Sequence, residues 1–278
     1  MTLGNELTFE ALVRLAFFIV VFAAMAIAEA SAPRRARALD RAARWPGNLA
    51  IAAINTALVR VLIPATAVGA AMVARRHEIG VLNWLALPRG VALVVAVAAL
   101  DLAIYLQHVM FHAVPILWRV HRMHHTDLDI DVTTGLRFHP IETILSMLIK
   151  IGAVIAIGAP PVAVLAFEVL LNANSMFNHG NLAISERTDR WLRWIVVTPD
   201  MHRVHHSIVR DETNSNFGFN LPWWDRMMGT YRAEPAAGQI AMTIGIDQFR
   251  SPQESGLMRM LTQPVREDAG QYPLGRDS

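Results

Sequence analysis

His121-Arg122-Met123-His124-His125 gives the strongest indication of the fold of this chain. The segment has a near copy, His202-Arg203-Val204-His205-His206, and is preceded by His108-xxx-His112. On a helix, residues three or four apart share one face, with Cβ atoms roughly 5–6 Å apart. Each cluster therefore directs its imidazoles at one point. A single pair at this spacing is more often a surface or capping feature, but three clusters predict helices that meet around two metal ions. Imidazole ligands suit iron, zinc, copper or nickel.

The composition is that of a membrane protein. The chain has 278 residues, of which 54% are hydrophobic and 17% charged, whereas soluble proteins carry roughly 25% charged residues. We therefore expect an all-α fold: an integral membrane helical bundle of about three spans plus a helical hairpin, with a cytoplasmic histidine-rich cap. The absence of cysteine leaves nitrogen and oxygen as metal ligands. A net charge of +2 gives no support for a nucleic-acid partner.

Apolar runs predict where the chain crosses the bilayer, which takes about 20 residues per helix. The predicted spans cover residues 11–30, 48–74 and 90–112. Two further apolar legs, 141–158 and 161–178, are joined by Gly158-Ala159-Pro160-Pro161, which predicts a helical hairpin.

Lys150 and Glu168 lie equally far from Ala159, on opposite legs of the predicted hairpin. A charge within a membrane helix costs several kcal/mol unless it is paired or hydrated. We therefore expect these two side chains to pair; the alternative is that each extends to the membrane surface.

Basic residues predict the orientation of the spans. Residues 31–46 hold five arginines and residues 113–140 hold three, whereas the first ten residues hold none and residues 74–89 hold three. Since basic loops face the cytoplasm, we expect the N-terminus outside and the histidine clusters in the cytoplasm. Arg75 and Arg76 count against this orientation.

The polar remainder from about residue 179 is expected to form the cap. Trp191, Trp194, Trp223 and Trp224 suit a surface at the level of lipid headgroups, or equally the core of the cap. The last 25 or so residues lack periodicity and are expected to form a loose tail.

Three polar residues near the clusters are predicted to support the ligands. Asp101 and Tyr105 share a helical face with His108 and His112, and a ligating histidine usually donates its second nitrogen to a carboxylate or carbonyl. Asp101 can take that role, or it can pack against Arg60 of the neighbouring span. Asp200, just before the third cluster, is the third such residue.

The order of motifs resembles the fatty acid hydroxylase and sterol desaturase superfamily of membrane di-iron enzymes. The motifs are Asp101-xxx-Tyr105-xx-His108-xxx-His112, the 118–125 segment, Phe138-His139-Pro140-Ile141-Glu142, Asn178-His179-Gly180, the 202–206 segment, Asn216-Phe217-Gly218 and the 224–230 segment. The resemblance divides the chain into an N-terminal transmembrane region (1–94), a catalytic domain (95–235) and a C-terminal tail (236–278).

The resemblance implies two irons and O2 as co-substrate. It implies the ligands His108, His112, His121, His124, His125, His139, His179, His202, His205 and His206. The implied reaction is hydroxylation, or desaturation, at a C–H bond of a lipid such as a fatty acyl chain, a sterol or an ether lipid. The lipid is expected to enter from the bilayer.

No HPGG haem segment, GxGxxG fingerprint or cysteine is present, so we expect electrons from a separate cytochrome, ferredoxin or flavoprotein reductase. The alternative hypothesis is a non-enzymatic membrane protein that binds metal or carries electrons. A transporter needs ionisable groups across the whole bilayer, and a bis-histidine haem protein leaves most of the histidines unexplained.

Overall fold

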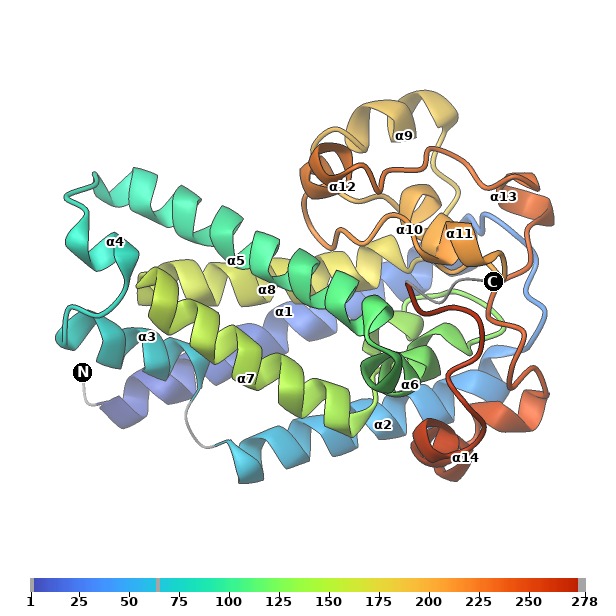
Figure 1. Cartoon of the computed structure of the whole chain (residues 1–278), viewed down its shortest axis with the longest axis horizontal. Helices are drawn as coiled ribbons and strands as arrows, with labels where there is room; N and C mark the ends of the chain where they lie inside the picture. The colour runs from blue at the N-terminus through green and yellow to red at the C-terminus, as the bar shows by residue number, and fades with distance from the viewer. Residues whose placement is uncertain (1–2, 64–65, 275–278) are drawn as a thin grey trace.

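The computed structural model describes residues 3–63 and 66–274, with side chains from residue 11 onward. Throughout these residues the chain is helical and has no strand, only two isolated β-bridges. Long helices lie side by side and form a bundle, and shorter helices form a cap at one end of it (Figure 1). The predicted all-α fold with a histidine-rich cap is confirmed.

The elements fall into two sets. The bundle is formed by α1 (Leu3–Ser31), α2 (Arg41–Leu62), α3 (Ala67–Arg76), α4 (Val81–Trp84), α5 (Arg89–Ala113), α7 (Pro140–Ile157) and α8 (Pro161–Asn178). The cap contains α6 (Pro115–His125), η1 (Thr134–Leu136), α9 (Glu186–Leu192), α10 (Pro199–His205), α11 (Arg210–Thr213), α12 (Trp223–Met228), α13 (Gly238–Ala241), η2 (Pro252–Ser255), α14 (Leu257–Thr262) and η3 (Gln263–Val265).

Several of the bundle helices are long and apolar enough to cross a membrane. By length and composition these are 11–31, 41–84, 89–113 and 140–157, the second of which runs over residues outside the described part. The stretch expected as one span over 48–74 contains two helices: α2 ends at Leu62, and α3 begins at Ala67 with the Thr66 hydroxyl accepting from the Gly69 N–H at 2.9 Å.

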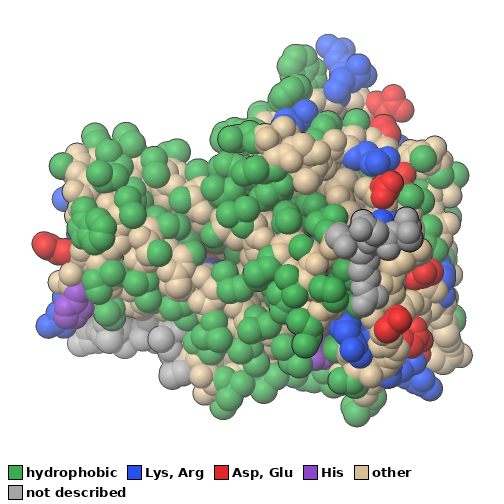
Figure 2. Space-filling view, viewed as in Figure 1, with side chains coloured by type: hydrophobic (Ala, Val, Ile, Leu, Met, Phe, Trp, Pro, Cys, Tyr) green, Lys and Arg blue, Asp and Glu red, His purple; other side chains and the backbone are tan. Residues whose placement is uncertain are grey.

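The outer surface of the bundle is apolar. Large hydrophobic side chains on α1, among them Leu12, Phe17 and Val20, are exposed, while α5, α7 and α8 bury a common core around Leu100, Val154 and Phe167. Charged side chains gather mainly on the cap and at the far end of the bundle, and the stretch between them is mostly apolar (Figure 2). This distribution fits a bundle surrounded by lipid.

The predicted hairpin is confirmed. α7 ends at Gly158, whose φ of +71° lies in the left-handed region that favours glycine. Pro161 then starts α8 at its first position. Gly80 lies against this turn so closely that a Cβ there would come within 2.3 Å of the Gly158 nitrogen.

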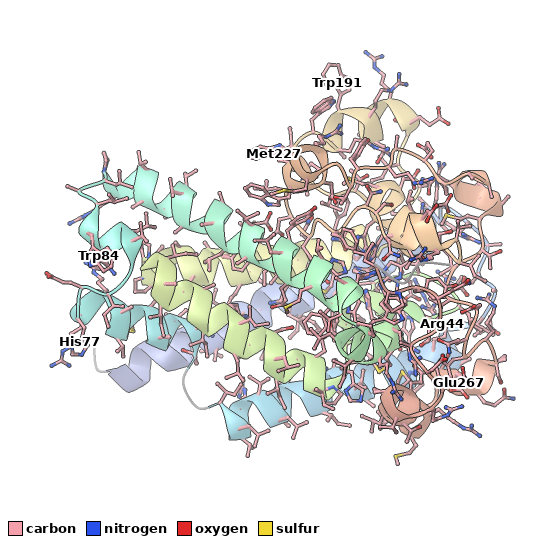
Figure 3. All side chains as sticks on the ribbon, viewed as in Figure 1. Arg44, His77, Trp84, Trp191, Met227 and Glu267 are labelled. Carbon is pink, nitrogen blue, oxygen red and sulfur yellow. The ribbon has the colours of Figure 1, made fainter. Side chains whose placement is uncertain are left out.

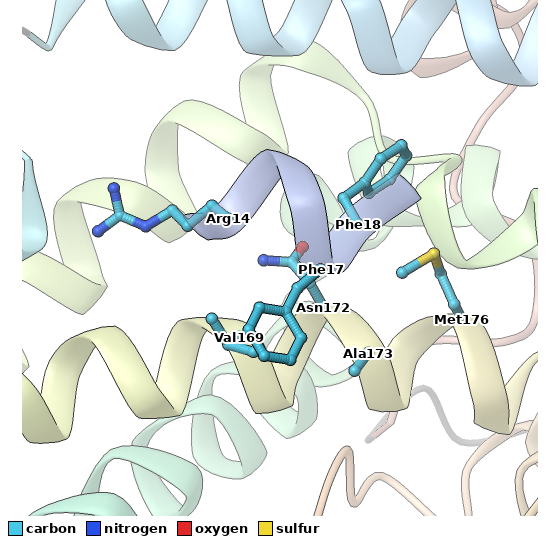
Figure 4. A pocket seen from close by; sticks show the side chains of 7 residues that line it. All are labelled: Arg14, Phe17, Phe18, Val169, Asn172, Ala173 and Met176. Carbon is cyan, nitrogen blue, oxygen red and sulfur yellow. The ribbon is translucent and has the colours of Figure 1, made fainter. Parts of the chain in front are cut away.

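The predicted pairing of Lys150 with Glu168 is also confirmed, because the two side chains meet at 2.6 Å across the hairpin. Sequence reasoning did not anticipate the third partner, Arg14 of α1, which contacts the other carboxylate oxygen at 2.7 Å. Beside this cluster a small pocket between α1 and α8 is lined by Arg14, Phe17, Phe18, Val169, Asn172, Ala173 and Met176 (Figure 4). One carboxylate thus ties three bundle helices together.

Glu168→Gln is expected to lower the free energy of unfolding by about 1–3 kcal/mol, because it leaves two partly buried cations without the buried carboxylate they share. Lys150→Met should cost less, since Arg14 still pairs with Glu168. The measurement is denaturant unfolding in detergent, with Lys150→Arg as the charge-preserving control. If the losses in the Lys150→Met/Glu168→Gln double variant were simply additive, the two side chains would not be energetically coupled.

Candidate metal centre

The histidine clusters come together at the cap end of the bundle, where α5, α6, α8 and α10 meet. His108 and His112 lie in the last two turns of α5, and His179 follows the last residue of α8. The short helices α6 and α10 each begin with a proline at the first or second position, where its fixed φ and missing N–H are tolerated. The histidines of α6 and α10 lie on the faces of these two helices that are turned toward α5 and α8.

Nine of the ten predicted ligands form two groups, and within each group the ligand nitrogens lie within 4.8 Å of one another. All nine side chains are buried. The first group contains His108, His112, His121, His125 and His205, and the second contains His124, His179, His202 and His206.

In the first group, hydrogen bonds at Nδ1 determine which ring nitrogen carries the proton. Nδ1 of His108 lies 2.7 Å from the Phe217 carbonyl, and Nδ1 of His205 lies 2.8 Å from the Ser215 carbonyl. A carbonyl oxygen can only accept, so in both rings the proton is on Nδ1. The Nε2 atoms therefore present lone pairs.

Two side-chain acceptors act in the same way on this group. Nδ1 of His121 lies 2.6 Å from Oε1 of Glu142, and Nδ1 of His112 lies 3.1 Å from Oδ1 of Asn214. The amide of Asn214 is oriented by its Nδ2, which donates to the Tyr272 carbonyl at 2.7 Å. Four of the five rings thus have Nδ1 hydrogen-bonded.

The second group repeats the pattern. Nδ1 of His124 lies 3.2 Å from the Arg137 carbonyl, and Nδ1 of His179 lies 2.7 Å from the Ser175 carbonyl. Both rings again donate outward from Nδ1 and leave Nε2 unprotonated.

Unprotonated nitrogens consequently face each other at short range. The Nε2 atoms of His108 and His121 are 3.2 Å apart, and those of His124 and His179 are 3.1 Å apart. Between His124 and His179 no proton is available to bridge the two Nε2 atoms, because both rings hold their proton at Nδ1 against a carbonyl, so their lone pairs repel unless a cation lies between them. Two imidazole nitrogens bound at about 2.0–2.1 Å to one ion lie about 3.0–3.4 Å from each other, and the residues therefore fit a metal.

Further ring nitrogens are buried and have no protein partner. They are Nε2 of His112 and His205, Nδ1 of His202, and both nitrogens of His125 and His206. An unpaired buried polar atom is costly, so this set also fits a site that binds ions.

Burial favours the neutral form of six of these rings by lowering their pKa values. It lowers the pKa of His124, His125, His202, His205 and His206 well below the usual histidine range, and it lowers the pKa of His179 to about 4. The neutral imidazole is the form that binds metal. The rings are therefore ready to act as ligands at neutral pH.

His139 is the predicted ligand that the structure places outside both groups. Its Nε2 donates to the Leu261 carbonyl at 3.2 Å, and its Nδ1 accepts from the Ile141 N–H at 3.2 Å as the N-cap of α7. With both nitrogens engaged, His139 caps α7 in this structure and lies apart from the grouped rings.

Asp101, expected beside a ligand histidine or Arg60, has other hydrogen-bond partners in this structure. The carboxylate accepts from Nδ2 of Asn220 at 2.8 Å, from the Leu221 N–H at 3.1 Å and from Nε1 of Trp224 at 2.8 Å. Asp101 therefore fastens the loop before α12 to α5.

Tyr105 and Asp200 likewise hold the surroundings of the centre rather than a ligand ring. The Tyr105 hydroxyl meets Oγ1 of Thr230 at 2.9 Å. Asp200 pairs with Arg203 and, at 2.8 Å, with Arg34 of the segment between α1 and α2.

Sequence reasoning missed two residues that do contact ligands, Glu142 and Asn214. Glu142 offered one signal, an acidic side chain at the start of an apolar leg directly after the Phe138-His139-Pro140 motif. Asn214 offered none, since its position opposite His112 depends on the tertiary fold.

The loop between the second histidine cluster and α7 is held by a buried arginine. Arg44 of α2 contacts Asp127 at 2.6 Å and Asp131 at 2.7 Å, with all three side chains inaccessible or nearly so. The opposite charge of Arg44 contributes to a depressed pKa for Asp127. Arg137, at the other end of this loop, donates to Oδ1 of Asn48 at 3.0 Å, so α2 fixes both ends of the loop that supplies the Arg137 carbonyl to His124.

The described part of the C-terminal stretch packs on the centre, so the expectation of a loose tail is wrong for residues 254–274. Tyr272 is fully buried and stacks on Trp118. Arg122 donates to the Gln263 carbonyl at 2.7 Å and also to the carbonyls of Arg266 and Asp268. The Leu274 N–H donates to the His112 carbonyl at 3.0 Å.

Apolar helices and two buried groups of histidines define a membrane-type protein with a histidine cluster that could hold metal ions. Residues 93–230 match the family model described as Fatty acid hydroxylase. The chain belongs to the fatty acid hydroxylase and sterol desaturase superfamily, as its motifs predicted.

Individual relatives match over longer and shorter stretches. The chain is 29% identical over 191 residues to the ornithine lipid hydroxylase OlsE of Rhizobium tropici, which covers 68% of this chain and 55% of that protein. It is 32% identical over 149 residues to the alkylglycerol monooxygenase of Xenopus tropicalis, covering 54% of this chain and 32% of the relative. The human alkylglycerol monooxygenase is 30% identical over 154 residues, covering 55% and 34%.

The match thus spans about half the length of the first relative and about a third of the other two. No solved structure matches the chain significantly.

Glu142→Ala is expected to lower the affinity of the centre for Zn²⁺ about 10- to 100-fold, because His121 loses the acceptor that orients its ring. Competition with a chelator measures this affinity. Asp189→Ala is the matched control: it removes a buried carboxylate of the cap that pairs with Arg193 and contacts no ligand histidine, and we expect it to reduce stability but not affinity. Equal losses of affinity in the two variants would contradict the assignment of Glu142.

Arg122→Lys is expected to loosen residues 263–274, since an ammonium group cannot reach the carbonyls that the guanidinium bridges. Loss of these bonds should lower local stability by about 1–3 kcal/mol, which hydrogen–deuterium exchange of that segment measures. Arg259→Lys, at an exposed position of α14, is the control. Unchanged exchange in Arg122→Lys would mean that other contacts hold the segment.

Proposed function

We propose that this protein is a di-iron, O2-dependent oxidoreductase that hydroxylates a C–H bond of a lipid. The observation that carries the proposal is the close approach of ring Nε2 atoms, at 3.1–3.2 Å, within each of two buried groups of histidines. Two groups imply two ions. Nitrogen ligands without thiolate suit iron among the metals that imidazole binds, and family membership supports that choice.

In the proposed assignment, the first ion is held by His108, His112, His121, His125 and His205, and the second by His124, His179, His202 and His206. Iron bound there supplies the redox chemistry that lets dioxygen attack an unactivated C–H bond. The protein orients the rings through Nδ1 and keeps water away by burying them.

Aromatic side chains connect the centre to the core of the bundle. Phe219 belongs to the hydrophobic core between the long helices and lies 5.1 Å from the ring of His108. Phe138 packs against the same core and stacks on His124 at 4.5 Å. An alkyl chain that enters from the bilayer between the helices would therefore reach the centre along an apolar path.

The names of the relatives support a lipid with a polar head and a long alkyl portion as substrate class, since they describe an ornithine lipid hydroxylase and alkylglycerol monooxygenases. They favour hydroxylation over desaturation. We further propose that a separate redox protein donates the electrons and that the centre faces the cytoplasm, where basic residues concentrate. The catalytic domain of residues 95–235 would then work together with the packed C-terminal residues described above.

Protein purified after expression with iron is expected to contain close to two irons per chain, measured by elemental analysis. His205→Ala should lose metal from the first group, whereas His139→Ala should keep both irons because His139 lies outside the groups. Full metal content in His205→Ala would remove that residue from the ligand set. A haem spectrum, or a single ion, would favour the electron-carrier or metal-binding alternatives.

Lipid extracts provide the functional readout. Cells that express the protein should contain a lipid with one additional oxygen atom that is missing from cells expressing His205→Ala. Loss of two hydrogens instead would indicate desaturation. Two irons with no lipid change under any donor system would contradict the enzymatic proposal.

A further inference from the structure

Two short helices of the cap, α9 and α12, together with the turn that follows α9, carry a group of exposed large apolar side chains. Met227 and Trp191 are each 71% exposed. The full group, here called the Trp/Met patch, is Trp191, Trp194, Ile195, Trp223, Met227 and Met228. Isolated exposed hydrophobic residues are ordinary, but six of them on neighbouring elements mark an interaction surface.

The Trp/Met patch is held in a fixed shape. The Arg226 guanidinium lies 3.9 Å from the ring centroids of both Trp194 and Tyr231. Nε1 of Trp223 donates to the Trp194 carbonyl at 2.7 Å, and Arg226 donates to the Arg193 carbonyl at 3.1 Å. The apolar side chains therefore project from an ordered base that joins α9 to α12.

The position of the Trp/Met patch in the fold indicates which surface it contacts. α9 and α12 project sideways from the cap, beside α5 (Figure 1). Met227 extends from the edge of this projection that is turned toward the far end of the bundle, and Trp191 lies on the same side (Figure 3). In the space-filling view that edge is largely hydrophobic, while basic and acidic side chains lie on the outer side (Figure 2).

The neighbouring surface is the exposed apolar face of α5, a helix long and apolar enough to cross a membrane. Val94, Val95 and Leu106 are exposed on it. A bilayer that surrounds α5 therefore ends beneath the overhanging Trp/Met patch. Tryptophan concentrates at that boundary, where its ring contacts both lipid and water.

We propose that the Trp/Met patch inserts into the boundary between headgroups and acyl chains of the leaflet next to the metal centre. The occupant is the lipid surface itself. Arg187 and Arg190, exposed on α9 beside the patch, add attraction for anionic headgroups.

This contact bears on the metal centre through α12. The Asp225 carboxylate accepts from the Phe217 and Gly218 N–H groups at 2.8 and 2.9 Å, and the Phe217 carbonyl accepts from Nδ1 of His108. Lipid that holds α12 in place therefore also holds the loop that orients one ligand. The docking surface itself does not depend on which metal the centre binds or on the reaction.

The chain has no cysteine, so single cysteines can be introduced for spin labelling without removing others. Met227→Cys reports on the patch. Ile240→Cys is the control, because Ile240 is a similarly apolar residue, 58% exposed, in α13 on the side of the cap away from the bundle. Each labelled protein is placed, one chain per disc, in lipid nanodiscs of phosphatidylcholine and phosphatidylglycerol.

Collision with oxygen, which concentrates in lipid, and with a water-soluble paramagnetic chelate gives the depth of each label. We expect the oxygen-to-chelate ratio to be several times higher at residue 227 than at residue 240. A ratio at 227 equal to that at 240 would overturn the proposal. The proposal would also be overturned if the label at residue 227 were shielded from the chelate only in discs that hold two chains. A second copy of the protein would then be covering the patch.

Unchanged thermal unfolding and Zn²⁺ binding of the labelled proteins verify the fold. Met228→Cys is the replacement position if Met227→Cys does not fold. The oxygen-to-chelate ratio at residue 227 is expected to rise with the share of phosphatidylglycerol in the disc. Loss of this rise in Arg187→Gln/Arg190→Gln would support the contribution of the two arginines.

Discussion

The structure of the cap depends on one constraint, which is to hold histidine rings whose nitrogen lone pairs face each other across about 3 Å. Neutral imidazoles at this distance repel, so the rings need hydrogen bonds that hold them from behind, and six of the nine have one at Nδ1. The acceptors that hold the rings come from many parts of the chain: the Phe217 and Ser215 carbonyls, the Ser175 carbonyl of α8, the Arg137 carbonyl and the Glu142 carboxylate. Irregular backbone around the centre is therefore a requirement of the ligand geometry.

Charged residues away from the centre keep those acceptors in place. Arg44 joins α2 to the loop that ends at Arg137, and Asp101 and Asp225 fasten the loop that contains Phe217. Inside the bundle, Glu168 connects three helices through Lys150 and Arg14. Arg44, Asp101, Asp225 and Glu168 are buried and each pairs with more than one partner, which offsets the cost of taking a charge out of water.

Local periodicity was enough to predict the features that depend on it. The spacing of the histidines predicted eight of the nine grouped rings, while His179 was expected only from the family resemblance, and the symmetry of Lys150 and Glu168 about Ala159 predicted their contact. Local periodicity did not indicate partners that come from distant segments. Asp101 shares a helical face with His108 but points to the 220–224 loop, and His139 is engaged by Leu261. Aperiodic sequence after residue 254 did not reveal that Arg122 would bind its carbonyls.

The C-terminal segment determines when, during translation, the histidine centre can assemble completely. Asn214 accepts from His112 while its amide donates to the Tyr272 carbonyl, and the Leu274 N–H reaches the His112 carbonyl. Translation produces all nine clustered histidines before it reaches these residues. When the last clustered histidine, His206, has left the ribosome, the residues that support His112 have not yet done so. The centre can therefore reach its final geometry only after residues 272–274 have emerged.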